Sequence, residues 1–441
     1  GLEDIYLGGA AGQIKRLFIQ KPGGKFMDSP QVDFSLDQTT ENTDAVFFDA
    51  DKDGDLDLFV VTGSNEFEEN APELHDLLYL NDGKGNLKRD VRFPMIYENG
   101  SSVSAADYDK DGDIDLFVGT RMINAKYGQS AQSNLFINDG TGGFKNQSKR
   151  YMPQVTDLGM VTDSEWSDVD GDGYQDLVVT QDWGPVVVFK NERGRKLTKQ
   201  EPVVGSEGLW GAIKSADIDG DGDVDFVLGN FGLNSKIKAT VEAPAYLHVG
   251  DFDKNGAVEQ LISCVTEDGN TYPMVLKGEM QRALPMIKKK FIKYKDYANK
   301  TVEELFTEEQ REGATVRQIQ TTQSSFMIND GKGNFSLQAL PYQAQFSPIK
   351  AIETGDFNKD GKLDILLAGN FFDSLPEWGR FDANYGLLLE GQGKGKFAVK
   401  LSKQTGFKTI GQVRNMALVK GGKSTYVVLA KNDDKAQVFK F

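Results

Sequence analysis

The chain has 441 residues, of which 50 are Lys or Arg and 66 are Asp or Glu, so its formal net charge is −16; 39% of the residues are hydrophobic. Such a surface is a poor partner for nucleic acid, whose binding relies on Lys and Arg displacing counterions, while the apolar share is enough for a folded core. The single cysteine, Cys264, excludes an internal disulfide framework. With only two histidines, His75 and His248, a catalytic or metal centre built from several histidines is also disfavoured. No apolar run approaches the roughly 18 residues of a transmembrane helix.

One acidic motif recurs along the chain, with side-chain oxygens at positions 1, 3, 5 and 9, a variable residue at position 7 and Gly at position 6. In chain order, positions 1, 3, 5, 7 and 9 are Asp49, Asp51, Asp53, Asp55 and Asp57; Asp107, Asp109, Asp111, Asp113 and Asp115; Asp168, Asp170, Asp172, Tyr174 and Asp176; Asp217, Asp219, Asp221, Asp223 and Asp225; Asp251, Asp253, Asn255, Ala257 and Glu259; and Asp356, Asn358, Asp360, Lys362 and Asp364. Residues 1–5 match positions six to ten of the same motif, so we expect the natural polypeptide to continue upstream of Gly1.

Short apolar stretches flank these motifs and predict buried strands. All copies except that at 251 are followed by an aliphatic or β-branched run, and a shorter stretch, clearest at 45–48, precedes them. The runs after the motifs are 56–61, 114–118, 177–180, 224–228 and 363–367. The local unit is therefore strand, acidic loop, strand.

A second recurring signal is a glycine hairpin of the type Asn-Asp-Gly-x-Gly at 81–85, 138–142 and 329–333, with looser versions at 21–24, 191–194 and 391–395. An apolar strand precedes each strict copy, at 77–80, 135–137 and 326–328, and 437–441 resembles one more such strand.

These signals combine into a repeating unit of four strands, A, B, C and D, with the acidic loop between A and B and the glycine hairpin between C and D. Four-stranded antiparallel units of about 50–60 residues are typical of β-propeller blades. Counting C strands predicts an all-β, seven-bladed propeller over residues 1–441. Counting the six acidic loops, the partial motif at 1–5 and a degenerate copy at 420–423 gives eight blades as the alternative, and the surplus lies between Asp217 and Asp251. A linear β-solenoid is disfavoured because it needs shorter, more uniform repeats.

Residues 276–312 break the strand pattern. Pro285 starts a basic stretch, and Thr301 with Glu304 fits a helix capping box. We expect a helical insertion within one blade.

The acidic loops have the composition of a site for a hard divalent cation. Alternating oxygen ligands with a glycine at the sharp turn suit Ca²⁺, whereas Mg²⁺ needs tighter octahedral geometry; position 7 would contribute its backbone carbonyl. An EF-hand is excluded because position 12 is Val60 or Val118 rather than Glu, and because the flanks are strands. The alternative is a set of plain acidic surface turns, but clustered carboxylates repel one another strongly unless a cation lies among them. We therefore expect about six structural Ca²⁺ ions.

The motif resembles the FG-GAP/VCBS repeat, whose cation loops join strands A and B in the propellers of integrin alpha subunits. Residues 1–13, 229–234 and 379–386 are similar to bacterial VCBS-repeat proteins related to cartilage acidic protein, which often carry an ASPIC/UnbV segment; that segment is not identified here. The resemblance covers nearly the whole chain. It implies a propeller that is secreted, periplasmic or on the outer surface of a bacterium, and it brings no defined catalytic site.

The face opposite the acidic loops is the candidate binding face. Its predicted B–C loops are long, at 62–75, 119–133, 229–245 and 369–385, and long loops on a rigid scaffold commonly carry binding. The candidate ligand-binding residues there are Trp183, Trp210, Trp378, Arg121, Arg380 and Asp382. The tryptophans could instead be wedges between blades. We expect a calcium-binding module for a protein or glycan partner, without a recognisable catalytic constellation; a glycosidase or lyase acting on the same face is the alternative.

Overall fold

The computed structural model describes residues 2–375, 378–422 and 424–441. Gly1, which opens the partial motif, and Lys423, which lies in the degenerate copy, are outside the described residues. Nearly all regular structure is antiparallel β-sheet, arranged as seven sheets in a ring and one further sheet outside it.

Each complete blade has the predicted strand order A-B-C-D, and the acidic loop joins A to B. The first three blades are β1 (Ile5–Leu7), β2 (Arg16–Lys21) and β3 (Lys25–Asp28); β4 (Asn42–Phe48), β5 (Asp57–Thr62), β6 (Leu77–Asn81) and β7 (Leu87–Asp90); and β8 (Gly100–Ala106), β9 (Asp115–Thr120), β10 (Asn134–Ile137) and β11 (Lys145–Asn146). The fourth comprises β12 (Met160–Ser167), β13 (Asp176–Gly184), β14 (Val187–Asn191) and β15 (Leu197–Lys199), with β16 (Gly208–Leu209) paired to β13.

The remaining three blades complete the ring. They are β17 (Ala212–Ala216), β18 (Asp225–Gly229), β23 (Ser325–Asn329) and β24 (Phe335–Ala339); β25 (Ile349–Gly355), β26 (Asp364–Gly369), β27 (Leu387–Gly393) and β28 (Lys396–Leu401); and β29 (Gln412–Gly421), β30 (Ser424–Asn432) and β31 (Gln437–Lys440). Short helices cover the connections: α1 (Val32–Leu36), α2 (Ser148–Tyr151), α8 (Ser402–Thr405), and the 3-10 turns Pro72–Leu74, Pro153–Asp157 and Tyr342–Gln345.

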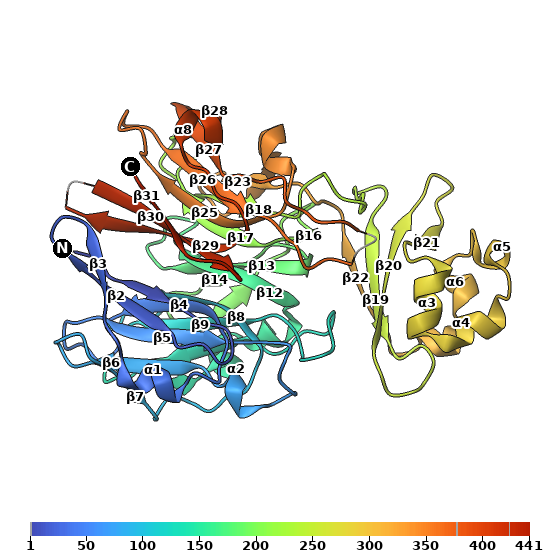
Figure 1. Ribbon diagram of the computed structural model, residues 1–441, viewed down its shortest axis with the longest axis horizontal. Coiled ribbons are helices and arrows are strands. Elements are labelled where there is room, and N and C mark those ends of the chain that lie inside the picture. Colours follow the sequence, from blue (N-terminus) through green and yellow to red (C-terminus); the bar gives the residue numbers. More distant parts are fainter. Residues whose placement is uncertain (1, 376–377, 423) are drawn as a thin grey trace.

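The ring closes by contact between its two ends. The inner strands β4, β8, β12, β17, β25 and β29 are successive neighbours. The first blade fills the gap between the last and the second, since Leu2 bridges Gly421 and the Lys420 N–H donates to Glu3 at 2.7 Å. Figure 1 shows these N- and C-terminal strands side by side. The ring therefore has seven blades, which confirms the predicted fold class.

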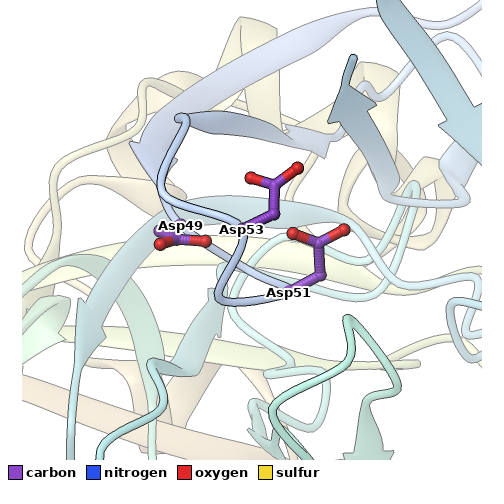
Figure 2. A group of neighbouring side chains, drawn as sticks. All are labelled: Asp49, Asp51 and Asp53. Atoms are coloured by element: carbon purple, nitrogen blue, oxygen red, sulfur yellow. The ribbon is translucent and has the colours of Figure 1, made fainter. Parts of the chain in front are cut away.

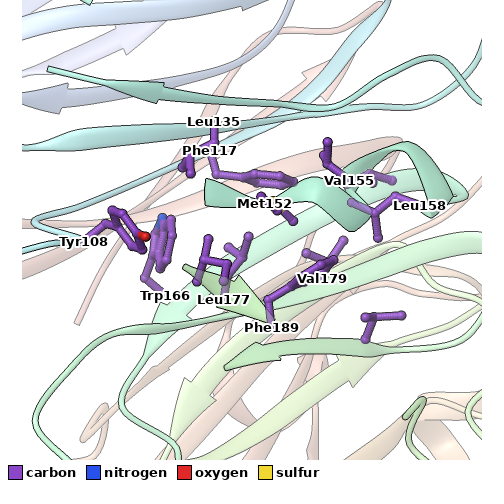
Figure 3. Packing of buried hydrophobic residues seen from close by; sticks show 13 residues of the cluster. Tyr108, Phe117, Leu135, Met152, Val155, Leu158, Trp166, Leu177, Val179 and Phe189 are labelled. Atoms are coloured by element: carbon purple, nitrogen blue, oxygen red, sulfur yellow. The ribbon is translucent and has the colours of Figure 1, made fainter. Parts of the chain in front are cut away.

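The blades are held together by large apolar side chains packed between adjacent sheets. Between the third and fourth blades, Phe117 and Leu135 on one sheet meet Leu177 and Phe189 on the other (Figure 3), and all four are fully buried. Trp166 completes this layer and donates its indole N–H to the Ser104 carbonyl at 3.2 Å. At roughly 25 cal/mol per Å² of apolar surface, such packing is the main source of stability for the ring.

The eighth sheet belongs to an insertion that connects strands B and C of the fifth blade, β18 and β23. It consists of β19 (Ala245–Gly250), β20 (Glu259–Val265), β21 (Thr271–Pro273) and β22 (Thr315–Ile319), in the order β21-β20-β19-β22. Helices α3 (Lys277–Ala283), α4 (Pro285–Lys290), α5 (Tyr294–Tyr297), α6 (Val302–Leu305) and α7 (Glu308–Arg311) lie at its far end (Figure 1). Thr301 and Glu304 make the capping box that the sequence predicts.

This insertion explains the surplus acidic motif between Asp217 and Asp251. The loop 251–259 joins β19 to β20, which lie in the inserted sheet and not in the ring. The long B–C connection, predicted as 229–245, continues through the whole insertion to Ser325. The predicted helical insertion is thus one end of a larger inserted unit, which also contains the sheet β19–β22.

Candidate metal centres and the opposite face

The acidic loops have a common backbone that is dictated by their sequence. In the loop 49–57, the Asp49 carboxylate accepts a hydrogen bond from the Gly54 N–H at 3.2 Å, and Lys52 and Gly54 have positive φ angles of 62° and 94°. The corresponding bond from the position-6 glycine is repeated in the other five loops. A glycine adopts this φ without strain, which is why the motif needs one at position 6.

Position 9 of each loop in the ring connects the loop to strand C. Asp57 is fully buried, and its two oxygens accept hydrogen bonds from the Ala50 N–H at 2.7 Å and the Asn81 N–H at 2.8 Å. The same pair of bonds forms at Asp115, Asp176, Asp225 and Asp364. Position 9 therefore fixes the loop as well as offering carboxylate oxygen to a cation.

Carboxylate oxygens converge inside these loops. Those of Asp49, Asp51 and Asp53 lie within 4.8 Å of one another (Figure 2). Equivalent groups are Asp107, Asp109 and Asp111; Asp168, Asp170 and Asp176; Asp217, Asp219 and Asp225; and Asp251, Asp253 and Glu259. Five of the six predicted loops thus bring three carboxylates together. In the sixth, 356–364, position 3 is Asn358 and supplies an amide oxygen.

Three loops also contain buried oxygens that have no hydrogen-bond partner among the described residues. In the loop 49–57 these are one oxygen each of Asp49, Asp51 and Asp55, and in the loop 107–115 one each of Asp107, Asp109 and Asp113. In the loop 251–259 one oxygen of Asp253 is in the same state. An unpaired buried carboxylate oxygen is costly, and a divalent cation supplies the missing partner. The donor set, all oxygen, fits Ca²⁺.

Burial and mutual repulsion act on the protonation of these carboxyls. Burial, followed by the neighbouring Asp111, raises the pKa of Asp113 to about 6, and burial is the main cause that raises the pKa of Asp115 to about 8. A bound cation would reverse both effects, because it favours the ionised form.

Lysines compete with a cation at some positions. Lys52, at position 4 of the first loop, places its Nζ 3.7 Å from the Asp113 carboxylate of the next blade, and Lys190 forms an ion pair with Asp170. In the loop 356–364, Lys362 Nζ lies 3.2 Å from Asp360. Lys362 is exposed at position 7, so only its backbone carbonyl could bind a metal ion.

The asparagines of the glycine hairpins have a role that sequence reasoning missed. Asn138 donates from its side-chain amide to the carbonyl of Ala50, at position 2 of the preceding blade's loop, at 2.8 Å, and to Ile114 in its own blade at 3.2 Å. Asn191 and Asn329 make the same pairs of bonds, to Tyr108 and Gln175 and to Val169 and Val224. Each hairpin therefore ties together the acidic loops of two blades. The sequence signal for these bonds is the asparagine that recurs at the start of each of these hairpins.

On the opposite face, two of the three candidate tryptophans are not available to a ligand, contrary to the expectation for a binding surface. Trp210 is fully buried and donates its indole N–H to the Ser206 carbonyl at 2.6 Å, and Trp183 is 3% exposed at the end of β13. Trp183 was expected in a B–C loop and Trp210 just before an A strand, with packing between blades as the alternative, and their large apolar area favours that burial. Trp378 is partly buried and packs on the cluster around Trp183.

The candidate charged residues fall into two groups. Arg380 and Asp382 are exposed and pair with each other at 3.4 Å, and the Arg380 guanidinium lies 3.5 Å from the centre of the Phe372 ring. Arg121 instead directly follows β9 and pairs with Asp182 of the neighbouring blade at 2.6 Å. Of the predicted ligand-binding residues, Arg121 is thus the one that places a charged group near the inner strands.

The two histidines make ordinary structural contacts. His75 is buried beside Arg89, and His248 Nε2 lies 2.9 Å from the Ser263 hydroxyl on the inserted sheet.

The ring of antiparallel sheets and its repeated acidic A–B loops define a β-propeller with FG-GAP-type loops. Residues 168–228, which include two of the acidic loops, match the FG-GAP-like repeat family. No curated protein matches the chain. Across the part of the chain that the structure describes, no helix combines the length and apolarity needed to cross a membrane.

Several solved structures are similar to the chain at low sequence identity. The Vibrio cholerae biofilm matrix protein Bap1 is 12% identical with a TM-score of 0.36, and the match covers 100% of this chain and 87% of that one. BBS1N, solved in complex with ARL6DN, is 10% identical with a TM-score of 0.40, covering 100% and 92%. The Dos1 propeller is 10% identical with a TM-score of 0.40, covering 98% and 87%.

Proposed function

We propose that the protein is a calcium-stabilised propeller that acts as a ligand-binding or scaffold module, with a protein or glycan partner, outside a bacterial cell: secreted, periplasmic or on the outer surface. The observation that carries the calcium assignment is the set of buried, unpartnered carboxylate oxygens in the loops 49–57 and 107–115. Four of these oxygens belong to positions 1 and 3 of the motif, which are ligand positions, and they lack a protein donor in the described chain: those of Asp49, Asp51, Asp107 and Asp109.

The loops would hold Ca²⁺ through positions 1, 3, 5 and 9, with the backbone carbonyl of position 7. When bound, the ion supplies charge neutralisation for the carboxylate clusters, and its role is structural. Calcium is abundant outside cells, and extracellular modules bind it at about 10⁻⁴–10⁻³ M. We expect the acidic loops to bind in that range, which the Ca²⁺ concentration outside cells would saturate.

A melting experiment tests the calcium assignment. In 2 mM Ca²⁺ we expect a melting temperature well above that in excess EGTA, because binding to the folded state alone stabilises it. Mg²⁺ at the same concentration should restore little of the difference. An unchanged melting curve in EGTA would count against structural calcium.

Binding to arrays of glycans and extracellular proteins tests the module assignment, with an assay of polysaccharide degradation beside it. We expect retention of a partner without turnover. Turnover that a carboxylate substitution on the B–C side abolishes would replace the binding module with an enzyme.

A further inference from the structure

A group of basic side chains meets at the end of the inner strands that is opposite the acidic loops. We call Arg121, Arg317, Lys350 and Arg414 the basic cluster. Arg121 follows β9, Lys350 lies near the start of β25, and Arg414 near the start of β29, each at a bulge or strand end. Arg317 comes from β22 of the insertion, which packs against β13 and β16. In a chain of net charge −16, such a cluster is unusual.

Asp182 is the acidic group at the centre of this cluster. It is 7% exposed and accepts hydrogen bonds from Arg121 at 2.6 Å and from the Tyr127 hydroxyl at 2.8 Å. Burial raises the pKa of Asp182, but the positive charges of Arg121 and Lys350 lower it by more, so the pKa of Asp182 lies below its ordinary value. One buried carboxylate therefore faces several cations.

Lys350 and Arg414 have little compensation of their positive charge, whereas Arg317 donates to the Gly128 carbonyl at 2.7 Å and to the Ser130 hydroxyl at 3.2 Å. Lys350 has no ion pair or hydrogen bond among the described residues, and burial together with Arg121 lowers its pKa to about 8. The Arg121 Nε–H is buried and also lacks a partner there. Arg414 reaches only the exposed Asp373, at 4.0 Å, with Glu41 as a further charge near it.

The backbone around the cluster is shaped to admit these side chains. A Cβ at Gly211 would lie 2.6 Å from Lys350 Nζ, and a Cβ at Gly159 would lie 2.9 Å from an Arg317 nitrogen. Trp183, next to Asp182, has a φ of 54°, a conformation that a buried non-glycine residue keeps only when its surroundings impose it. Strain of this kind concentrates at functional sites.

We propose that Arg121, Lys350 and Arg414 bind the carboxylate group of a uronic-acid-containing glycan at this end of the inner strands. A carboxylate would pair with the Arg121 guanidinium, whose side chain is 42% exposed, and with the Lys350 ammonium, because Arg guanidinium groups suit planar oxyanions. The aromatic rings of Tyr127 and Trp378, both only partly buried against the Trp183 cluster, provide apolar faces for a sugar ring. This inference rests on the proposed binding function and names its ligand class.

The test is binding of oligogalacturonate and oligoglucuronate to the calcium-loaded protein, with the matched neutral oligosaccharides and an acidic peptide as comparison ligands. We expect binding of the uronates only, weakened about tenfold or more by Lys350→Ala and by Arg414→Ala, and largely kept by Lys350→Arg. Arg16→Ala, which breaks the exposed pair with Asp28, should have no effect. Raising the salt concentration should weaken binding.

Three binding results would overturn the inference, and a complete lack of binding is a fourth. The three binding results are uronate binding that Lys350→Ala leaves unchanged while its calcium-dependent melting stays normal, equal binding of neutral sugars, and binding of the acidic peptide alone. The last two would leave the binding-module function standing, whereas retention of no partner at all, on these ligands and on the arrays, would remove both.

Discussion

The loops 49–57 and 251–259 have nearly the same motif but lie in different surroundings. In the ring, Asp57 fastens both to its own loop and to strand C, and Asn138 of the next blade bonds to the loop's position-2 carbonyl. In the inserted sheet, Glu259 accepts the Phe252 N–H at 3.0 Å, and Phe252 packs on Phe306 of the helical end at 4.6 Å between ring centres.

This difference separates what the motif does from what the propeller does. The motif alone forms the turn and gathers three carboxylates, which occurs in both places. The ring adds hydrogen bonds that run from blade to blade. A cation in a ring loop should therefore stabilise two blades, whereas one in the loop 251–259 should stabilise only the insertion.

The largest difference should follow loss of the position-9 side chain. Asp57→Ala leaves the buried Ala50 N–H and the partly buried Asn81 N–H unpaired, so we expect a loss of about 2–4 kcal/mol of unfolding free energy. Glu259→Ala removes one bond at a half-buried position and should cost about 1 kcal/mol. Urea titrations in Ca²⁺ measure both, and equal losses would contradict the comparison.

Removal of a bond between blades should have the next largest effect. Asn138→Ala removes the amide donor to the Ala50 and Ile114 carbonyls, although Ala50 keeps the Gly142 N–H at 3.0 Å, so we expect a loss of about 1–2 kcal/mol. Asn334→Ala is the control, since this exposed amide bonds only within its own turn, to Asp330 at 2.9 Å. Equal losses of stability in the two variants would contradict a stabilising role for the Asn138 bonds between blades.

Much of this architecture could be predicted from the sequence, for physical reasons that also explain the misses. The acidic loops and glycine hairpins are local structures, because each needs particular residues at a fixed spacing. Their positions in the sequence therefore predict the strands beside them, and the number of strands predicts seven blades. The ties made by Asn138 depend on a neighbour 88 residues away. Likewise, the burial of Trp183 and Trp210 and the meeting of Arg121 with Asp182 depend on how blades face one another, which local patterns do not contain.

The inner strands provide a pH-dependent test. Burial, helped by Asp44, raises the pKa of Asp163 from 3.8 to about 7, and Asp163 accepts the Ile213 N–H of the next blade at 2.9 Å. The folded state thus holds this proton more tightly than the unfolded state, so its stabilising contribution is present at low pH and is lost as pH rises from about 4 to about 7.

We expect Asp163→Asn, measured in saturating Ca²⁺, to reduce the fall in melting temperature between pH 5 and pH 8. Asp268→Asn in the insertion should leave that slope unchanged, because hydrogen bonds from Thr266 and Asn270 lower the pKa of Asp268 and it stays ionised throughout this range. If the melting temperature of Asp163→Asn falls as steeply with pH as that of the unaltered protein, other groups are responsible for the pH dependence.

The smallest effect should come from the loop 251–259. Asp253→Asn removes one carboxylate from its cluster, so we expect one Ca²⁺ fewer per chain and a change in unfolding free energy below about 1 kcal/mol. Asp51→Asn should lose one ion and destabilise more. A large loss of stability in Asp253→Asn would show that the inserted loop supports the ring after all.

The most direct measurement of the central claim is a crystal structure grown in Ca²⁺, with anomalous difference maps, together with calorimetric titration of the metal-free protein. We predict one anomalous peak among the carboxylates of each acidic loop and a stoichiometry of about six. Loops that hold only water in millimolar Ca²⁺, with no heat of binding, would contradict the claim.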